Sequence, residues 1–345
     1  MEKNRESGIE LFRCVLMCMI IFLHMLIHGV NGEIVSFRNG QSYEISLFES
    51  FFAIFCMVSV NCYVMISGYF GIKINKKKLI KTYLPILFYS FFIALFFFIT
   101  KKINSAELLK SLFPVSKVTY WFATCYIFLC IVSPILDSII EKYYQEKRFY
   151  LLIAFFLVIT WIPRVGNGLR SVLGLSSFGF SQIVVSYVIG RCISLLEIDS
   201  DSQVFIKTRK IFVQNKIYDF LFFIVCSLVS FSVTAILFFI TKKNYWFALS
   251  AYSSPMTIFA SIFLFQFFKK LKLGHKKIIN IFGSTTFGIY LIHENPYMRP
   301  VIYQFFHAYD FKFSSLLIPY ISLCTLVVFI MGGGWILSVN FSFQQ

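Results

Sequence analysis

The first apolar block of the sequence carries four ionisable residues, a type that membrane helices rarely contain. They are Glu10, Arg13, His24 and His28. At about 100° per residue, Arg13 and His24 differ by about 20° around a helix axis, and the other two fall within about 60° of Arg13. All four therefore share one stripe. Because charged groups in membrane helices usually face the bundle interior, we expect the stripe to line a cavity.

Arg13 and His24 suit two steps of a transfer reaction. They lie about 16 Å apart along a helix, with Arg13 nearer its N-terminal end. A guanidinium offers directed donors to a phosphate or a polar chain. An imidazole can take a proton from a hydroxyl near neutral pH, or act as a nucleophile itself, and the sequence leaves both roles open. It also leaves open a purely structural Glu10–Arg13 ion pair, an Arg13 that snorkels to headgroups, and a packed His24.

Later apolar blocks add further polar candidates. In the second block, glycine in Ser67-Gly68 permits close approach of a ligand or, equally, of another helix. Trp121 opens the fourth block, as an interfacial anchor or as a ring on which a sugar stacks. The candidate substrate-binding residues are Glu10, His28, Asn61, Trp121, Tyr126, Tyr290 and His293.

The ninth block ends in His293, Glu294 and Asn295, at a depth similar to His24 and His28. We expect them to line one cavity, although His293 alternatively hydrogen-bonds only the frayed helix end. The two histidines of the first block, four residues apart, offer two metal ligands, but no third stands out, so we expect no metal. The sequence has no Walker loop, no GxSxG motif and no Rossmann glycine pattern, which argues against an ATP-driven pump.

A dense cluster of lysines follows the second block: Lys73, Lys76, Lys77, Lys78 and Lys81. They could attract a polyanionic cofactor or bind anionic lipid headgroups. With the residues above, the candidate cofactor-binding set is Arg13, Ser67, Gly68, Lys73 and Lys76.

Composition defines the elements that must position these residues. The chain of 345 residues is 58% hydrophobic and 14% charged, against about a quarter charged in soluble domains. Its apolar blocks approach the ~20 residues that cross ~30 Å of hydrocarbon as a helix, and they do not alternate as barrel strands do. We therefore predict an all-α, polytopic membrane helix bundle of about ten transmembrane helices, a single domain over residues 1–345. The predicted spans are Ile9–Val30, Ile45–Phe70, Thr82–Thr100, Tyr120–Ile140, Phe149–Ile162, Phe178–Gly190, Ile217–Ile240, Trp246–Phe268, Ile278–Asn295 and Phe313–Leu337.

Charge placement predicts the orientation. The net charge is +16, but the basic residues sit in short links between apolar blocks, so we expect no nucleic-acid binding and contacts with membrane lipids instead. Segments on the side of the N-terminus hold about twice as many Lys and Arg as those on the other side, which predicts that both termini are cytosolic. The nine cysteines lie mostly inside apolar blocks and are expected to pack.

Several short motifs resemble one family. Ile9-Glu-Leu-Phe-Arg13, followed by ten residues and His24, is similar to the Arg-x10-His signature of the membrane acyltransferase 3 family. Further blocks that resemble this family follow in order along nearly the whole chain: Asn61-Cys-Tyr63, Ile66-Ser-Gly-Tyr69, Tyr120-Trp121-Phe122-Ala-Thr-Cys-Tyr126, Ser133-Pro134 and Phe287-Gly-Ile-Tyr-Leu-Ile-His293.

The resemblance implies a ten-helix enzyme of the bacterial inner membrane that O-acylates a surface polysaccharide or a lipid-linked sugar. It implies acetyl-CoA or a related acyl-CoA as co-substrate. It also implies that Arg13 and His24 are needed for activity, with His28 as a weaker match. Where many relatives carry His-Pro after the last block, this chain reads Glu294-Asn295-Pro296. The alternative class is a glycan or lipid-linked sugar transporter or flippase without acyl chemistry.

Overall fold

The computed structural model describes residues 6–30, 46–73, 75–146, 179–198, 215–308 and 316–338, together with residues 148, 151, 154 and 158. Within them the regular structure is helical and strands are absent. This confirms the all-α membrane bundle. Among the described residues, seven helices are long and apolar enough to span a membrane: Ser7–Gly29, Leu47–Phe70, Lys76–Ile99, Trp121–Gln145, Phe180–Glu197, Lys216–Thr241 and Leu317–Gly334.

Two shorter helices complete the match to the predicted spans. α13 (Pro255–Lys269) and α14 (Lys277–His293) have 15 and 17 residues, so they rise only about 22 and 26 Å. The predicted span Phe149–Ile162 lies almost entirely outside the described residues. All of the other nine predicted spans overlap helices of the structure, with edges that differ by several residues.

The predicted span Trp246–Phe268 is wrong as one continuous helix. It is divided into α12 (Trp246–Leu249) and α13, with a non-helical segment at residues 250–254 between them. Inside a membrane protein such backbone is tolerated where it is buried or lines a cavity. Here Thr257 Oγ1 donates a hydrogen bond to the Ser250 carbonyl, at 3.1 Å. One backbone carbonyl of the non-helical segment therefore has a side-chain partner.

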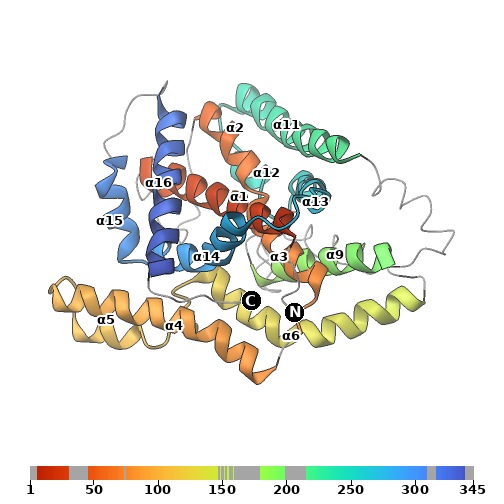
Figure 1. Cartoon of the computed structure of the whole chain (residues 1–345). Coiled ribbons are helices and arrows are strands. Elements are labelled where there is room, and N and C mark those ends of the chain that lie inside the picture. Colours follow the sequence, from red (N-terminus) through yellow and green to blue (C-terminus); the bar gives the residue numbers. More distant parts are fainter. Residues whose placement is uncertain are drawn as a thin grey trace.

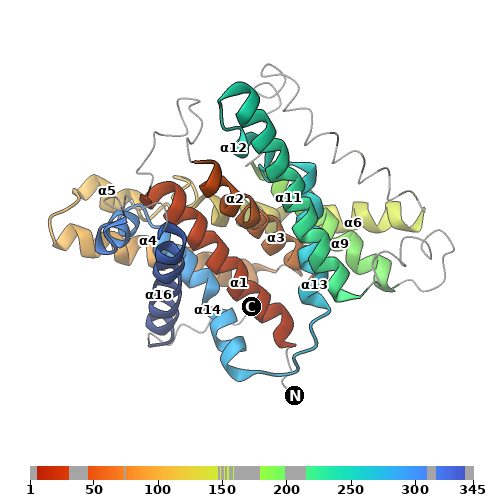
Figure 2. The ribbon, with the colours of Figure 1, turned by 90° about the horizontal axis from the view of Figure 1, so that it is seen from above.

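Helix α1 (Ser7–His24) lies in the middle of the molecule in both views (Figures 1 and 2). It packs against α14 and α13, and also against α2 (Leu47–Cys56), α3 (Ser59–Phe70) and α16 (Leu317–Ser338). Its first half is fixed by aromatic packing, since the Phe12 and Phe268 rings stack with centroids 4.5 Å apart. The polar stripe of α1 is therefore surrounded by protein.

The outer helices present apolar side chains outward. They are α4 (Lys76–Ile99) and α6 (Trp121–Gln145), along the lower edge of Figure 1, and α11 (Lys216–Thr241), at its upper edge. Large apolar side chains on α4 and α11 are more than half exposed, for example Phe96 at 60% and Ile236 at 57%. Such surfaces on a soluble protein would be costly, whereas lipid tails cover them without cost.

A glycine and an asparagine shape the short link between α3 and α4, which carries the first lysine of the cluster. α3 ends at Gly71, whose φ of 70° is favourable for glycine. The Asn75 side chain then caps α4 by accepting from the Lys78 N–H, at 2.8 Å. The remaining short elements are a π-helical turn, η1 (Met25–Val30), α5 (Ser105–Lys110) and α15 (Met298–Phe305). α9 (Phe180–Ile198) packs against α3 and α6.

Candidate active site

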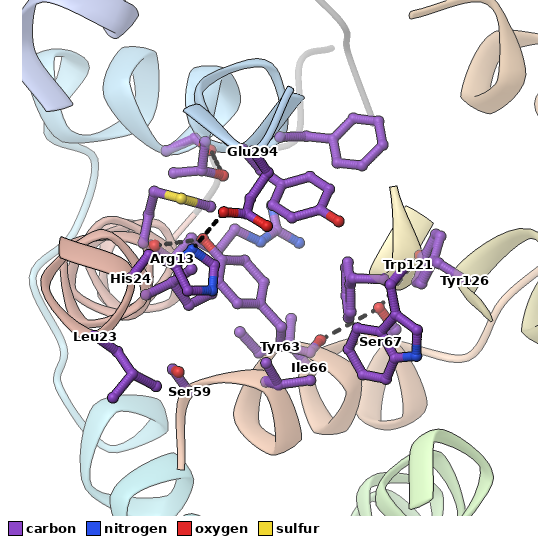
Figure 3. A pocket seen from close by; sticks show the side chains of 18 of the residues that line it. Arg13, Leu23, His24, Ser59, Tyr63, Ile66, Ser67, Trp121, Tyr126 and Glu294 are labelled. Atoms are coloured by element: carbon purple, nitrogen blue, oxygen red, sulfur yellow. Dashed lines mark hydrogen bonds and ion pairs between the residues drawn. The ribbon is translucent and has the colours of Figure 1, made fainter. Parts of the chain in front are cut away.

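A cavity of about 140 Å³ lies beside α1, between α3, α6 and α14 (Figure 3). Figure 3 shows His24 and Arg13 on one wall, Glu294 above them and Trp121 with Tyr126 on the opposite side. The cavity is therefore built by residues that are far apart in the sequence. Its polar lining residues are Arg13, His24, Ser59, Tyr63, Ser67, Thr82, Trp121, Tyr126, Tyr252, Ser284, Thr286, Tyr290 and Glu294.

His24 is held by the end of α14. Its Nδ1 lies 2.9 Å from Glu294 Oε1 and 3.2 Å from His293 Nε2. Arg299, at the start of α15, lies 3.7 Å from the other Glu294 oxygen. The side chains of His24 and Glu294 are only 20% and 18% exposed. Their attraction is therefore less screened by water than that of a surface ion pair.

These contacts fix the proton positions of the two imidazoles in their neutral forms. His293 Nδ1 lies 2.8 Å from the Ile289 carbonyl oxygen, which can only accept, so Nδ1 of His293 carries the proton and its Nε2 is an acceptor. His24 Nδ1 then faces two acceptors, this Nε2 and the Glu294 carboxylate, and must donate. The lone pair of His24 is thus on Nε2, the ring nitrogen that Figure 3 shows on the cavity side.

A π-helical turn begins directly after His24. In η1 the chain changes from the α-helical pattern just where the imidazole is placed, as π-turns at functional sites often do. Tyr303 of α15 donates its hydroxyl to the His24 carbonyl, at 3.2 Å. The His28 ring lies beside the His24 ring, with centroids 5.8 Å apart, and His28 is not among the residues that line the cavity.

At the other end of the stripe, Arg13 pairs with Glu10. Arg13 Nη1 lies 3.0 Å from Glu10 Oε1, so the ion pair that the sequence left open is present. Gly283 of α14 permits this arrangement, because a Cβ at that position would collide with the Glu10 side chain. The Tyr63 hydroxyl donates to the Arg13 carbonyl, at 2.6 Å, and ties α3 to α1.

A second, larger cavity of about 1070 Å³ adjoins the first. It is lined by Glu10 and by three lysines of the cluster, Lys73, Lys78 and Lys81, whereas Lys76 is exposed and not part of the lining. The two cavities share six lining residues and therefore meet: Arg13, Ile66, Ser67, Thr82, Tyr126 and Phe287. Arg13 thus stands between the lysines and His24.

The remaining predicted site residues divide into two groups. Ser67, Trp121, Tyr126 and Tyr290 all line the smaller cavity, and the Ser67 and Tyr126 hydroxyls lie 3.2 Å apart. In contrast, Gly68 and Asn61 are not among the residues that line either cavity.

The positions of Gly68 and Asn61 indicate what they do in the fold. A Cβ at Gly68 would collide with the Tyr187 carbonyl of α9, so this glycine allows α3 and α9 to pack closely. Asn61 donates from Nδ2 to the Tyr252 carbonyl, at 2.9 Å, and its Oδ1 accepts from Ser186 Oγ, at 3.0 Å. The Asn61 amide therefore provides a hydrogen-bond partner for a backbone carbonyl in the non-helical segment between α12 and α13.

The sequence analysis missed several site residues, among them Tyr252 and Glu294. Tyr252 enters the cavity lining because the helix is broken there, and Ser253-Ser254-Pro255 is a helix-start signal that could have revealed the break. Glu294 was placed near the cavity but was assigned no role, because it departs from the His-Pro pattern of the resembled family. Only the packing of α14 on α1 shows its contact with His24.

One comparison with known proteins identifies a family. A family model described as an acyltransferase domain, of the acyltransferase 3 type, matches residues 6–339. The match covers both ends of the polar stripe, both cavities and the end of α14. Among curated proteins and solved structures, none matches the chain.

Proposed function

The chain belongs to the acyltransferase 3 family, and from this premise we propose that it transfers an acetyl or related acyl group from cytosolic acyl-CoA to a sugar hydroxyl. The acceptor is a cell-surface polysaccharide or a lipid-linked sugar. Family membership and the apolar helices identify the protein as a membrane acyltransferase. One observation supports the rest of the proposal: His24 Nε2 faces a cavity that joins a larger, lysine-lined cavity at Arg13.

The donor is proposed to enter through the larger cavity. A volume of about 1070 Å³ is at the upper end of the range for ligand pockets, and its lysines attract the phosphates of acyl-CoA. Arg13 then holds a phosphate or the polar pantetheine chain with its directed N–H groups. The smaller cavity, of about 140 Å³, suits the acyl end of the donor and one hydroxyl of the acceptor.

In the proposed reaction His24 acts first as a base and then as an acid. The acceptor hydroxyl gives its proton to His24 Nε2 while its oxygen attacks the thioester carbonyl carbon. Glu294 stabilises the imidazolium that forms, because its carboxylate lies 2.9 Å from Nδ1. The tetrahedral intermediate then collapses, the C–S bond breaks, and the departing CoA sulfur takes the proton back from Nε2. The products are the sugar ester and free CoA thiol.

Transient acylation of His24 is the second route. There Nε2 attacks the thioester itself, CoA leaves, and the acyl-imidazole passes its group to the sugar. The accessible lone pair on Nε2 serves both routes. Rapid-quench analysis separates them, since only the second leaves labelled acyl group on the protein when the acceptor is omitted.

We place the protein in the bacterial inner membrane with both termini in the cytosol. The family resemblance supports this membrane, and the excess of Lys and Arg on the cytosolic side of the predicted spans supports the orientation. In this orientation the lysine-lined cavity opens toward the cytosolic pool of acyl-CoA, and His24 lies nearer the outer leaflet, where the acceptor arrives.

The deciding test uses purified full-length protein with labelled acetyl-CoA and a glycan acceptor. The proposal expects a labelled, alkali-labile ester on the glycan and an equal amount of CoA thiol. The alternative, a transporter or flippase without acyl chemistry, would move glycan across vesicle membranes and form no ester. Ester-free transport by protein that is folded and monodisperse would reject the acyl-transfer proposal.

A further inference from the structure

The His24 end of α1 gathers three atoms of the kind that bind metal ions. His24 Nδ1, His293 Nε2 and a carboxylate oxygen of Glu294 lie within 4.8 Å of one another. The two distances from His24 Nδ1 are 2.9 and 3.2 Å. In a tetrahedral zinc site with bonds of about 2.0–2.1 Å, ligand atoms are about 3.3 Å apart. Two of the three separations therefore match such a site, and the third is no more than 4.8 Å.

The hydrogen bond behind His293 supports this reading independently. A histidine that binds a metal through one ring nitrogen commonly donates the other N–H to a carbonyl or carboxylate. His293 Nδ1 donates in this way to the Ile289 carbonyl, at 2.8 Å. This bond turns the Nε2 lone pair toward His24 and Glu294. Two imidazoles and one carboxylate, with the cavity as an open fourth position, are a donor set that zinc uses in proteins.

We propose that His24, His293 and Glu294 bind a zinc-type divalent cation, and that the bound cation inhibits acyl transfer. The cation takes the Nδ1 lone pair of His24, so the proton of the neutral imidazole moves to Nε2. With a proton already on Nε2, His24 cannot accept one from the sugar hydroxyl or attack the thioester. The inhibition rests on the proposed role of His24, whereas the binding does not.

Arg299 opposes the cation. Its guanidinium lies 3.7 Å from the second oxygen of Glu294, where its charge repels a dication and competes for the carboxylate. Arg299→Gln therefore strengthens the binding of zinc. This direction distinguishes the proposed site from a surface histidine, because zinc at an exposed position would be insensitive to Arg299.

Binding is tested with the full-length protein in detergent, carrying an affinity tag without histidine. Titration with Co²⁺, followed by its tetrahedral absorption bands, and calorimetry with Zn²⁺ should show one ion per chain. His293→Ala and Glu294→Gln should weaken binding at least about tenfold, while His275→Ala, an exposed histidine, should not change it. Equal affinities in all four proteins would overturn the metal site, provided that each variant elutes as folded protein.

Inhibition is tested by measuring acyl transfer with added Zn²⁺ and again after EDTA. The unmodified protein should lose activity and regain it, and His293→Ala should need at least about tenfold more Zn²⁺ relative to its own metal-free rate. If zinc binds one per chain but the rate is unchanged, the inhibition and the proposed role of His24 are both rejected and the metal site remains. Absence of binding rejects the metal site alone.

Discussion

At the Arg13 end of α1, the charged group is held by Glu10, three residues earlier on the same helix, and faces a cavity of about 1070 Å³. At the His24 end, the partners come from the end of α14, and the cavity holds only about 140 Å³. The first end is wide and basic, and it suits a large anionic donor. The second is narrow and tightly contacted, and it suits the positioning of one proton.

The two ends therefore tolerate change differently. A contact within one helix persists as long as the helix forms, and a flexible donor can adapt to a wide cavity. A contact between α1 and α14 depends on the packing of the whole bundle, and proton transfer needs hydrogen-bond distances. Substitutions at the His24 end should cost the most activity, and those among the lysines the least.

The largest expected effect is that of His24→Ala. Removal of the base should lower the rate of acyl transfer by about 10³-fold, because general base catalysis contributes 10²–10⁴-fold. The measurement is labelled ester formed per minute by purified protein that inserts normally. His275→Ala, on an exposed link, is the control. A rate near that of the unmodified protein would show that the two ends of α1 do not differ as proposed.

Glu294→Gln should follow, with a loss of about 10²-fold. The amide keeps the size of the side chain but not the charge, so it no longer stabilises the imidazolium. The loss should fall on kcat rather than on KM for acyl-CoA. Glu146→Gln, at the exposed end of α6, should leave both unchanged. An effect confined to KM would show that Glu294 acts in donor binding and not in proton transfer.

Arg13→Lys should cause an intermediate loss, about tenfold in kcat/KM. A lysine keeps the charge but lacks the planar fork of donors that a phosphate or pantetheine chain uses. Here KM for acyl-CoA should rise more than kcat falls, the opposite of Glu294→Gln. The exposed Arg148→Lys is the matched control. If kcat falls alone, the guanidinium acts in the chemical step and not in donor binding.

The smallest effect is expected for Lys78→Gln combined with Lys81→Gln. Both lysines are exposed and line the larger cavity, so their attraction to the donor is screened by salt. KM for acyl-CoA should rise about two- to fivefold at low salt, and the difference should shrink at high salt. Lys110 and Lys117, exposed in the link between α4 and α6, provide the control pair. A salt-independent rise would indicate a directed contact.

The break between α12 and α13 shows why some elements could be predicted and others not. Hydropathy depends on the average of about 20 residues, so Trp246–Phe268 reads as one span although its middle is non-helical. The break is stabilised by Asn61, from a helix nearly 200 residues earlier, whose amide binds the Tyr252 carbonyl. Asn61 itself was expected to contact substrate. A buried amide gives no sign in the sequence of which buried partner it will find.

Two properties of the chain follow from the sequence by itself, because both depend on local spacing. The apolar blocks make a membrane helix bundle, since each must span the hydrocarbon with its own hydrogen bonds satisfied. The helical period places Glu10, Arg13, His24 and His28 on one face of the first helix. Tertiary structure alone decided which groups complete that face. Packing brought Glu294 and His293 to His24 and joined the two cavities at Arg13, because contacts between distant helices depend on how the whole bundle packs and not on neighbours in the chain.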